Sequence, residues 1–272
     1  MNSPLLHVFR NTPFGRETLL LSAYSCQKLQ LPLDIYLPKE KRFLFYFDAD
    51  VVQIDLDSSY LRDKGSARQH AEELIESFSL QHRFISPCSQ TATGLPDLQT
   101  NFSLMTCPRS MSDVTGRIGL GHIGPKVRRI LQLAPFPVLL PSAAYKPWNK
   151  LTVLYGGSPL AAVSVRLAMQ LQKRCHLPMQ IISVGDRPSL EKALESQGLI
   201  EQVHSCDWRV FPGSSLNDHF FEIPHDALVV LGAYGHGPIK ALLGSSMEMV
   251  QSQLPNPLLV VGPRYRSLSD YS

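Results

Sequence analysis

An internal repeat constrains the fold of this chain more than any other feature of its sequence. The segment GPKVRRILQLAPFPVLLP begins at Gly124, and a similar segment, GSSMEMVQSQLPNPLLVVG, begins at Gly244. Each indicates a short helix that opens at a glycine, a P-x-P break that ends the helix, and an apolar run typical of a buried strand. The chain therefore contains two copies of one folding unit.

The starts of the two copies also match. LLHVFRNTPFGRETLLLSAY, from Leu5, aligns with LTVLYGGSPLAAVSVRLAMQ, from Leu151. Thr12 in the first and Ser158 in the second are each followed by proline, which is typical of a helix N-cap with proline in the first turn. Each copy is therefore predicted to begin with a strand, a tight turn and a capped helix.

Apolar runs and helical patterns alternate along both copies, which is typical of a parallel sheet covered by helices. Strands of the first copy are predicted near 5–10, 32–37, 82–86, 102–106 and 137–141. Strands of the second are predicted at about 151–155, 179–184, 203–210, 227–231 and 257–262, with helices at about 159–175, 189–198, 214–223 and 245–253. The sequence thus predicts an α/β protein of two tandem five-stranded parallel-sheet domains, 1–141 and 148–264, joined through a linker over 142–150.

The first copy carries an insertion, FLFYFDADVVQIDLD, which indicates one or two extra strands, as in a hairpin. A helix is predicted after it over 59–79, because Ala71, Leu74, Ile75 and Phe78 fall on one face. The first domain is therefore expected to be a degenerate version of the second.

Composition excludes several classes of protein. The net charge of +3 is too small to predict nucleic-acid binding. No apolar run reaches the roughly 18 residues that a membrane-spanning helix needs, and the N-terminus lacks a signal-peptide pattern. The five cysteines are widely spaced without C-x-x-C, which favours a reducing cytoplasm, and the histidines form no metal-binding motif.

Charge is distributed unevenly along the chain. No acidic residue lies between Asp113 and Asp186, whereas nine basic residues do. The two interpretations are solvated helix faces, which we favour because the residues are scattered, and attraction to an anionic ligand. The nine are Arg117, Lys126, Arg128, Arg129, Lys146, Lys150, Arg166, Lys173 and Arg174.

The strongest local motif is LVVLGAYGHGPIKALLGSSMEMV in the second copy. An apolar strand ends in Gly232-x-x-Gly235, and Gly244-Ser245-Ser246 then opens a helix. A strand end, a glycine turn and a helix N-terminus with hydroxyls can form an anion site, because free N–H groups and the helix dipole favour phosphate. The spacing alone leaves open a loop that only needs glycine for its backbone and an ordinary serine cap.

A rival motif, G-x-G-x-x-G, spans Gly119 to Gly124 and is similar to the dinucleotide fingerprint of NAD-dependent dehydrogenases. The residues before it make a poor buried strand, and the helix after it lasts only about nine residues. The acidic residue that would hold the ribose is missing. No P-loop, no G-x-S-x-G elbow and no catalytic carboxylate pair occurs, so we do not expect an enzyme.

Taken together, these motifs resemble those of the universal stress protein family in its tandem form. The resemblance rests on the glycine-serine motif, on the P-N-P-L-L-V-V ending and on Tyr155-Gly-Gly-Ser158 after the first strand of the second copy. It covers residues 148–262 well and 5–141 more weakly. It implies an adenine-nucleotide alpha-hydrolase-like, Rossmann-like fold, and some members of the family bind ATP or AMP.

The resemblance also implies where a nucleotide would lie. It places the adenosine at the turn Gly156, Gly157 and Ser158 and after the second strand near Val184, and the phosphates at the glycine-serine motif. The implied phosphate-site residues are Gly232, Gly235, His236, Gly244, Ser245 and Ser246. Nucleotide-binding members usually carry Asp where this chain has Gly156, and the phosphate loop is one residue shorter here, so we expect modest affinity.

The first copy departs further from the family motif. Arg10-Asn11 stands where Gly156-Gly157 stands, Cys107 replaces Gly232, and Pro125 replaces Ser245. We therefore expect a single nucleotide site, in the second domain.

The expected role is a stress-response regulator or sensor with no metal and at most slow incidental hydrolysis. The alternative is a degenerate scaffold or binding module for a non-nucleotide anionic ligand. The two domains are expected to pack as an intramolecular pseudo-dimer through their apolar last strands. A homodimer and an unidentified regulatory protein partner stay open, and neither nucleic acid nor membrane is expected as a partner.

Overall fold

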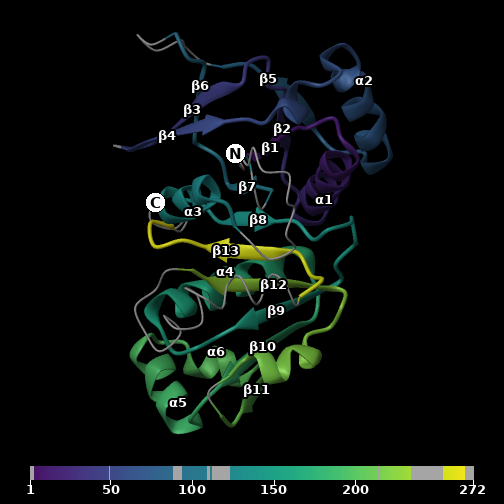
Figure 1. The fold of residues 1–272 in the computed structure, drawn as a ribbon. Coiled ribbons are helices and arrows are strands. Elements are labelled where there is room, and N and C mark those ends of the chain that lie inside the picture. The colour runs from purple at the N-terminus through teal and green to yellow at the C-terminus, as the bar shows by residue number, and fades with distance from the viewer. Residues whose placement is uncertain are drawn as a thin grey trace.

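The computed structural model describes residues 3–48, 50–87, 94–108, 111, 123–213, 215–233 and 254–266 (Figure 1). The strands are β1 (Leu5–Val8), β2 (Leu33–Tyr36), β3 (Arg42–Phe47), β4 (Asp50–Asp55), β5 (His82–Ile85), β6 (Asp97–Gln99), β7 (Leu104–Thr106), β8 (Val138–Leu140), β9 (Lys150–Leu154), β10 (Met179–Val184), β11 (Asp207–Phe211), β12 (Ala227–Gly232) and β13 (Leu258–Val261). The α-helices are α1 (Pro13–Leu29), α2 (Lys64–Ile75), α3 (Pro125–Leu133), α4 (Pro159–Cys175), α5 (Arg187–Ser196) and α6 (Ile200–His204). The 3-10 helices are η1 (Ser58–Leu61), η2 (Glu76–Phe78) and η3 (Asn217–Glu222).

Ten of these strands form one continuous sheet, in the order β11-β10-β9-β12-β13-β8-β7-β1-β2-β5. The strands of each half run parallel, and the strand order of one half is repeated in the other. The halves meet where β13 pairs antiparallel with β8, with Leu259 opposite Leu139. This pairing confirms that the two apolar last strands cover each other. The exact domain boundaries stay a prediction.

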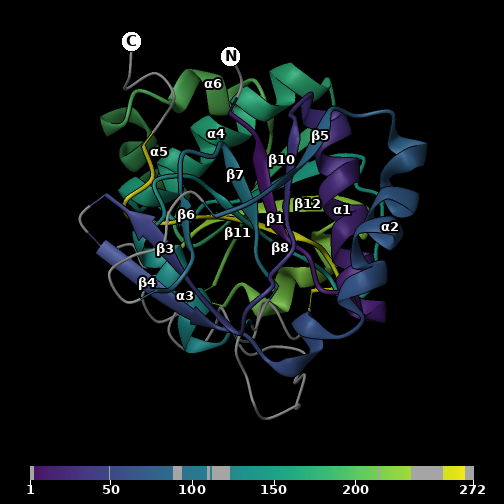
Figure 2. The same cartoon turned by 90° about the horizontal axis from the view of Figure 1, so that it is seen from above.

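The sheet separates two layers of side chains. On one face, α1, α2, α4, α5 and α6 bury their apolar residues in a common core. On the other face lie α3, the inserted strands and the segment around η3. Figure 2 shows the inserted strands and α3 opposite α1 and α2. Because β13 and β8 are antiparallel, the carboxyl ends of the strands of the first half and those of the second half lie at opposite edges of the sheet.

Both predicted helix caps are present. The Thr12 hydroxyl accepts the Gly15 N–H at 3.1 Å, and the Ser158 hydroxyl accepts the Ala161 N–H at 3.1 Å. Each cap is followed by proline at the start of a 17-residue helix. A cap satisfies one of the N–H groups that a helix leaves unpaired at its N-terminus, so α1 and α4 begin at fixed residues.

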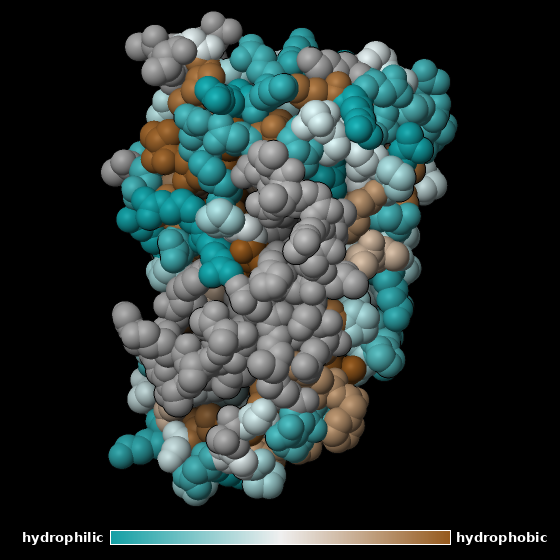
Figure 3. All heavy atoms as spheres, in the orientation of Figure 1, coloured by the Kyte–Doolittle hydropathy of each residue, from teal (hydrophilic) through white to brown (hydrophobic). Residues whose placement is uncertain are grey.

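The insertion forms a small sheet of its own. β3 and β4 make the predicted hairpin, and β6 adds a third strand parallel to β3. β6 was not predicted, because a strand of three residues shows no clear alternation. In Figure 3 hydrophobic atoms gather over this small sheet. Val51 on β4 is 48% exposed.

The predicted helix over 59–79 is broken into η1, α2 and η2. Asp63 and Ser79 both adopt left-handed backbone angles, with φ near +50°, which end a helical segment on either side of α2 and η2. The predicted apolar face is confirmed, because Ala71 and Ile75 are buried and Leu74 and Phe78 pack against the same core.

Two predictions in the second half were wrong in detail. The strand predicted over 203–210 starts only at Asp207, because Val203 belongs to α6 and is buried on the helical layer. The helix predicted over 214–223 is a short 3-10 helix, η3, with Gly213 in a left-handed conformation before it and Pro224 after it. The helix predicted over 245–253 lies outside the described residues.

The linker between the halves is ordered, as predicted. Trp148 is fully buried, and its carbonyl accepts the Tyr24 hydroxyl of α1 at 2.7 Å. The Tyr145 N–H donates to the Glu17 carboxylate of α1 at 2.6 Å. The connection therefore forms part of the packed helical layer.

Candidate functional site

Three strand ends meet at the carboxyl edge of the second half. β10, β9 and β12 are neighbours and run parallel, so Val184, the turn after Leu154 and Gly232 reach the same edge. In open parallel sheets, ligands bind outside the carboxyl ends of the strands, where the strand order reverses. Here β9 lies at that reversal, since the chain moves outward from it to β10 and later returns on its other side to β12.

The β9–α4 turn is shaped by glycine. Gly157 has φ of +80°, a conformation that residues with a side chain rarely adopt. A Cβ placed there would lie 3.4 Å from Leu190 Cδ2 of α5, so the turn also packs closely against that helix. Gly156, Gly157 and Ser158 are all half-buried. Their backbone is therefore accessible at the edge.

The Ser158 hydroxyl has two roles available to it. It accepts the Ala161 N–H as the cap of α4, and it retains its own proton as a donor. The N-terminus of α4 carries a partial positive charge from the helix dipole, which favours an anion or a polar ligand atom nearby.

The β10–α5 connection lies beside this turn. Val184 is half-buried, and Gly185, at φ of +133°, donates its N–H to the Phe211 carbonyl. Asp186 then caps α5, and its carboxylate accepts the Ser189 hydroxyl at 2.6 Å and the Ser189 N–H at 3.0 Å. These bonds lower the pKa of Asp186, first through the hydroxyl and then through the backbone. Sequence reasoning missed this carboxylate, although Asp-x-Pro-Ser is a recognisable cap signal.

The lack of a side chain at Gly232 lets the end of β12 pack closely against α4. A Cβ there would lie 3.0 Å from Leu160 Cγ and 3.0 Å from the Leu160 carbonyl oxygen. The first turn of α4 thus rests directly on the end of β12, and Leu160 fills the space beside Gly232. The other predicted phosphate-site residues, Gly235, His236, Gly244, Ser245 and Ser246, lie outside the described residues.

In the first half, backbone atoms occupy the space beside the equivalent β1–α1 turn. A Cβ on Gly15 would lie 1.7 Å from the Arg10 carbonyl oxygen, so this carbonyl presses onto the first turn of α1. Ala161, which holds the matching position in α4, does carry a Cβ. The β1–α1 turn therefore folds closer to its helix than the β9–α4 turn does.

The Arg10 side chain closes the same edge further. Its guanidinium lies 3.5 Å from the Asp57 carboxylate and over the rings of Tyr60 and Phe14, at 5.2 and 5.6 Å from their centroids. Only 12% of the side chain is exposed. Asp57 and Tyr60 belong to the segment that follows the inserted hairpin. Sequence reasoning predicted the loss of the glycines here but not these partners.

Tyr60 lies in the core beneath Arg10. It is 4% exposed, and its hydroxyl has no hydrogen-bond partner among the residues that the structure describes. Burial raises the pKa of Tyr60, while the nearby Arg10 charge opposes that rise. Cys107, at the position that matches Gly232, is buried close by, and burial raises the pKa of its thiol.

Asn11 is held in a separate cluster. Its amide nitrogen lies 2.9 Å from His70 Nδ1 of α2, and its amide oxygen accepts from Arg16 Nε at 3.2 Å. Arg10 and Asn11, which stand where Gly156 and Gly157 stand in the second half, thus both contact neighbouring elements through their side chains.

Three basic residues of the acid-free stretch form ion pairs with separate acidic partners. Lys126 lies 3.5 Å from Asp55, Arg129 lies 3.4 Å from Asp50, and Lys150 lies 3.7 Å from Asp226. These pairs are spread over different elements, which supports the interpretation as solvated faces.

Comparisons with known proteins support the fold. No protein-family model matches the chain. The chain is 24% identical over 195 residues to a universal stress protein of Synechocystis sp., a match that covers 68% of this chain and 65% of that protein. It superposes on the crystal structure of a universal stress protein from Archaeoglobus fulgidus with a TM-score of 0.61 and 15% identity, over 96% of this chain and 98% of the other.

The chain has the universal stress protein fold. The resemblance predicted from the motifs is thereby confirmed, and so is the α/β class with a large, mostly parallel sheet. The same fold also matches the cytoplasmic domain of a prokaryotic cation chloride cotransporter, with a TM-score of 0.53, 10% identity and full coverage of both chains. The fold alone therefore does not assign a function.

Within the described part of the chain, no helix combines the length and hydrophobicity needed to cross a bilayer. In that same part, no three His, Cys, Asp or Glu residues gather as metal ligands would.

Proposed function

We propose that this chain is a stress-response protein that holds one adenine nucleotide, ATP or AMP, at the carboxyl edge of its second half and acts as a regulator or sensor. The sequence similarity to a universal stress protein supports the stress-response role. The match covers less than two thirds of the length of that relative. The regulator or sensor role is therefore proposed for this chain and not transferred from the relative.

One observation carries the nucleotide part of the proposal, which is the difference between the two strand–helix turns. The β9–α4 turn presents accessible glycine backbone and a capped helix N-terminus. Such a turn can accept the sugar and base of a nucleotide close to the main chain, because Gly156 and Gly157 themselves carry no side chain. At the β1–α1 turn, Arg10 and its partners fill the equivalent space.

The proposal includes a binding role and no catalytic one beyond slow incidental hydrolysis. It also places the protein in the cytoplasm, where ATP and AMP are available and thiols stay reduced. Cys26, Cys107, Cys175 and Cys206 are free thiols.

The competing function is a scaffold or a module for a non-nucleotide anion. Gly156 favours it, because a glycine offers no carboxylate to accept a hydrogen bond from the adenosine, a contact worth about 1–3 kcal/mol.

Co-purification separates the two functions. Protein purified without added nucleotide is heat-precipitated, and the supernatant is examined by ultraviolet absorbance and chromatography. We expect an adenine nucleotide, or, if the site empties during purification, binding of added ATP or AMP in a titration. Binding of sulfate or pyrophosphate without any binding of ATP or AMP would instead support the anion module, and binding of none of them would support the scaffold.

A further inference from the structure

The sheet has two outer strands, and they differ in charge. β11 closes the end formed by the second half, and β5 closes the end formed by the first (Figure 1). Among the described residues, no strand pairs with the outer edge of either one. An edge strand offers a row of backbone donors and acceptors to another chain unless side chains prevent the approach.

The backbone groups of β11 divide between its two sides. β11 pairs with β10 in parallel, and the Phe211 carbonyl accepts the Gly185 N–H on that side. Because alternate residues of a strand direct their N–H and C=O groups to opposite sides, Asp207 and Arg209 also bond toward β10. Trp208 and Val210 therefore direct their backbone groups outward, away from the sheet.

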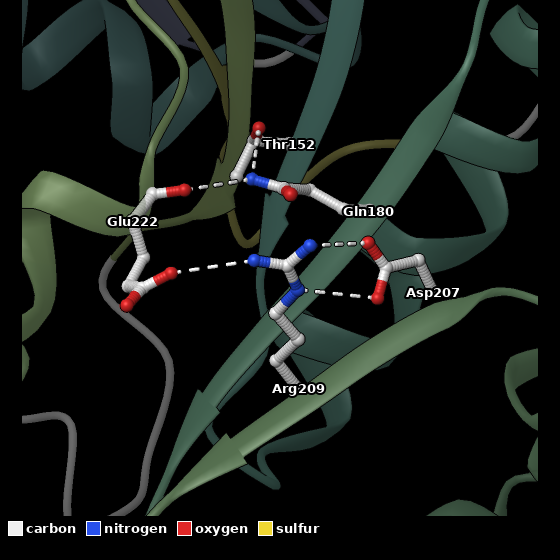
Figure 4. Close-up of polar contacts among 5 residues, drawn as sticks. All are labelled: Thr152, Gln180, Asp207, Arg209 and Glu222. Carbon is white, nitrogen blue, oxygen red and sulfur yellow. Dashed lines mark hydrogen bonds and ion pairs between the residues drawn. The ribbon is translucent and has the colours of Figure 1, made fainter.

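The charges on β11 would be complementary to those on the β11 of a second copy. Asp207 and Arg209 flank Trp208 and lie on one face of the sheet, with Arg209 Nη2 3.0 Å from the Asp207 carboxylate and Nη1 3.3 Å from Glu222 (Figure 4). A two-fold axis at Trp208 would set Asp207 of each copy opposite Arg209 of the other. In that register Trp208 is a hydrogen-bonded pair with itself, and the charged residues face each other in the closer, non-hydrogen-bonded pairs.

Other arrangements lack this match. An axis at Arg209 would set two guanidinium groups opposite each other, and an axis at Val210 would leave the charges without opposite partners. Strand β5 exposes His82 and Arg83 but has no acidic residue to set opposite them in a second copy, and Arg83 is bound to Asp34 of the neighbouring β2, so that edge does not complement itself. Charge thus selects both the strand and the register.

An exposed aromatic side chain lies next to the same edge. Phe221 of η3 is 78% exposed. It is joined to β11 through His219, whose ring stacks on Phe211 at 4.4 Å and lies 6.4 Å from Phe221. An aromatic side chain in solvent thus lies beside the unpaired edge, where a partner strand would find it.

We propose that β11 is a self-pairing edge, where a second copy of this chain adds its own β11 antiparallel about Trp208. The contact is isologous, so it closes as a dimer and does not propagate. The sheet of one copy would continue into the sheet of the other.

Sedimentation velocity of the full chain over a range of concentrations tests this directly. We expect a monomer–dimer equilibrium in the wild type and a monomer in Val210→Pro, since proline removes an outward N–H that no bond among the described residues uses. Val210→Thr keeps that N–H and is the matched control, which we expect to dimerise. A wild type that stays monomeric, or a dimer that persists in a folded Val210→Pro, would overturn the proposal.

Charge exchange provides a second test that does not alter the backbone. Asp207→Arg and Arg209→Glu each place like charges opposite one another twice per dimer, so we expect the dissociation constant to rise by about tenfold or more. The double exchange D207R/R209E restores opposite charges in the same register and is expected to recover the dimer. Dimerisation that ignores all three changes, or a double exchange that stays as weak as the single ones, would contradict the register.

Discussion

The β1–α1 turn and the β9–α4 turn occupy equivalent positions in the two halves of the sheet, yet their surroundings are opposite. Both follow the first strand of their half, and both lead into a 17-residue helix capped by a hydroxyl and started by proline. In the first half, the turn presses onto its helix and Arg10 covers it. In the second half, the turn is half-buried and Gly157 holds it in a left-handed conformation.

The difference indicates that the residues that specify the fold of each half are not the residues that shape its candidate site. Strand pattern, cap and proline maintain the fold in both halves, whereas two or three residues of the turn decide whether the edge is open. An inserted segment can then occupy the closed edge, as Asp57 and Tyr60 do, without changing the order of the strands.

The largest expected effect concerns the contact that makes the two halves one unit. Leu259 is 1% exposed and pairs with Leu139 across the β13–β8 contact. Leu259→Lys would bury a charge there, and we expect a loss of about 3–5 kcal/mol of stability in urea denaturation. Val51→Lys, at an exposed position, is the control and should change little. Two halves that unfold independently, with only the second destabilised, would show that they are separate bodies.

The second largest effect is expected from a buried histidine that only the first half has at this position, and it concerns the stability of the protein at low pH. His7 of β1 is buried where the matching residue of β9 is Val153, and burial lowers the pKa of His7 from 6.5 to about 3. Below pH 6.5 the unfolded chain binds a proton that the native chain does not, so stability falls as pH falls. We expect this loss to be on the order of 2–3 kcal/mol at pH 4.5.

His7→Val copies the second half and isolates this effect. Denaturation of the wild type and the variant at pH 7 and pH 4.5 gives the difference between their pH dependences. If the two lose the same stability between these pH values, His7 does not account for the acid sensitivity.

A smaller effect is expected from opening the first-half turn. Arg10→Ala removes the contacts with Asp57 and Tyr60, and we expect a loss of about 1–2 kcal/mol. Lys173→Ala removes an exposed basic residue from α4 and should cost less than about 0.5 kcal/mol. Thermal denaturation compares them. Equal losses in both variants would mean that Arg10 is not a closing contact of the first half.

The smallest expected effect is on affinity. Gly156→Asp would add the carboxylate that the resemblance to nucleotide-binding universal stress proteins implies at this turn. We expect tighter binding of ATP by roughly tenfold, which corresponds to one added hydrogen bond to the ligand. Titration calorimetry measures the change, and an unaltered or weaker affinity would indicate a pocket shaped for another ligand.

Much of the fold could be predicted from the sequence because its signals are local. The caps at Thr12 and Ser158, the proline break after α3 and the apolar last strands each act within a few residues, and the structure confirms them. The proline break of the second copy follows a helix predicted outside the described residues. β6 and the pieces of the helix over 59–79 could not be predicted, because they depend on pairing with distant β3 and on single left-handed residues.

The candidate site was less predictable. Gly232 carries a motif that suggests a ligand, whereas its neighbour in space is Leu160, 72 positions earlier in the chain. The partners of Arg10 lie about 50 residues away in the sequence, at the end of the insertion and just after it. The insertion itself is visible in the sequence, but no local pattern reveals where it packs in the folded protein. Sequence patterns identify which turn lacks side chains, but long-range packing decides what fills the space.

The number of nucleotide sites per chain tests the central claim most directly. Titration calorimetry with ATP or AMP should give one site in the wild type and one in Arg10→Gly, because a single substitution leaves Asp57 and Tyr60 in the first-half edge. Gly156→Arg, which copies the first-half residue into the second, should remove binding while thermal denaturation shows that the variant remains folded. Two equivalent sites in the wild type, or undiminished binding in a folded Gly156→Arg, would contradict the account of one open and one closed edge.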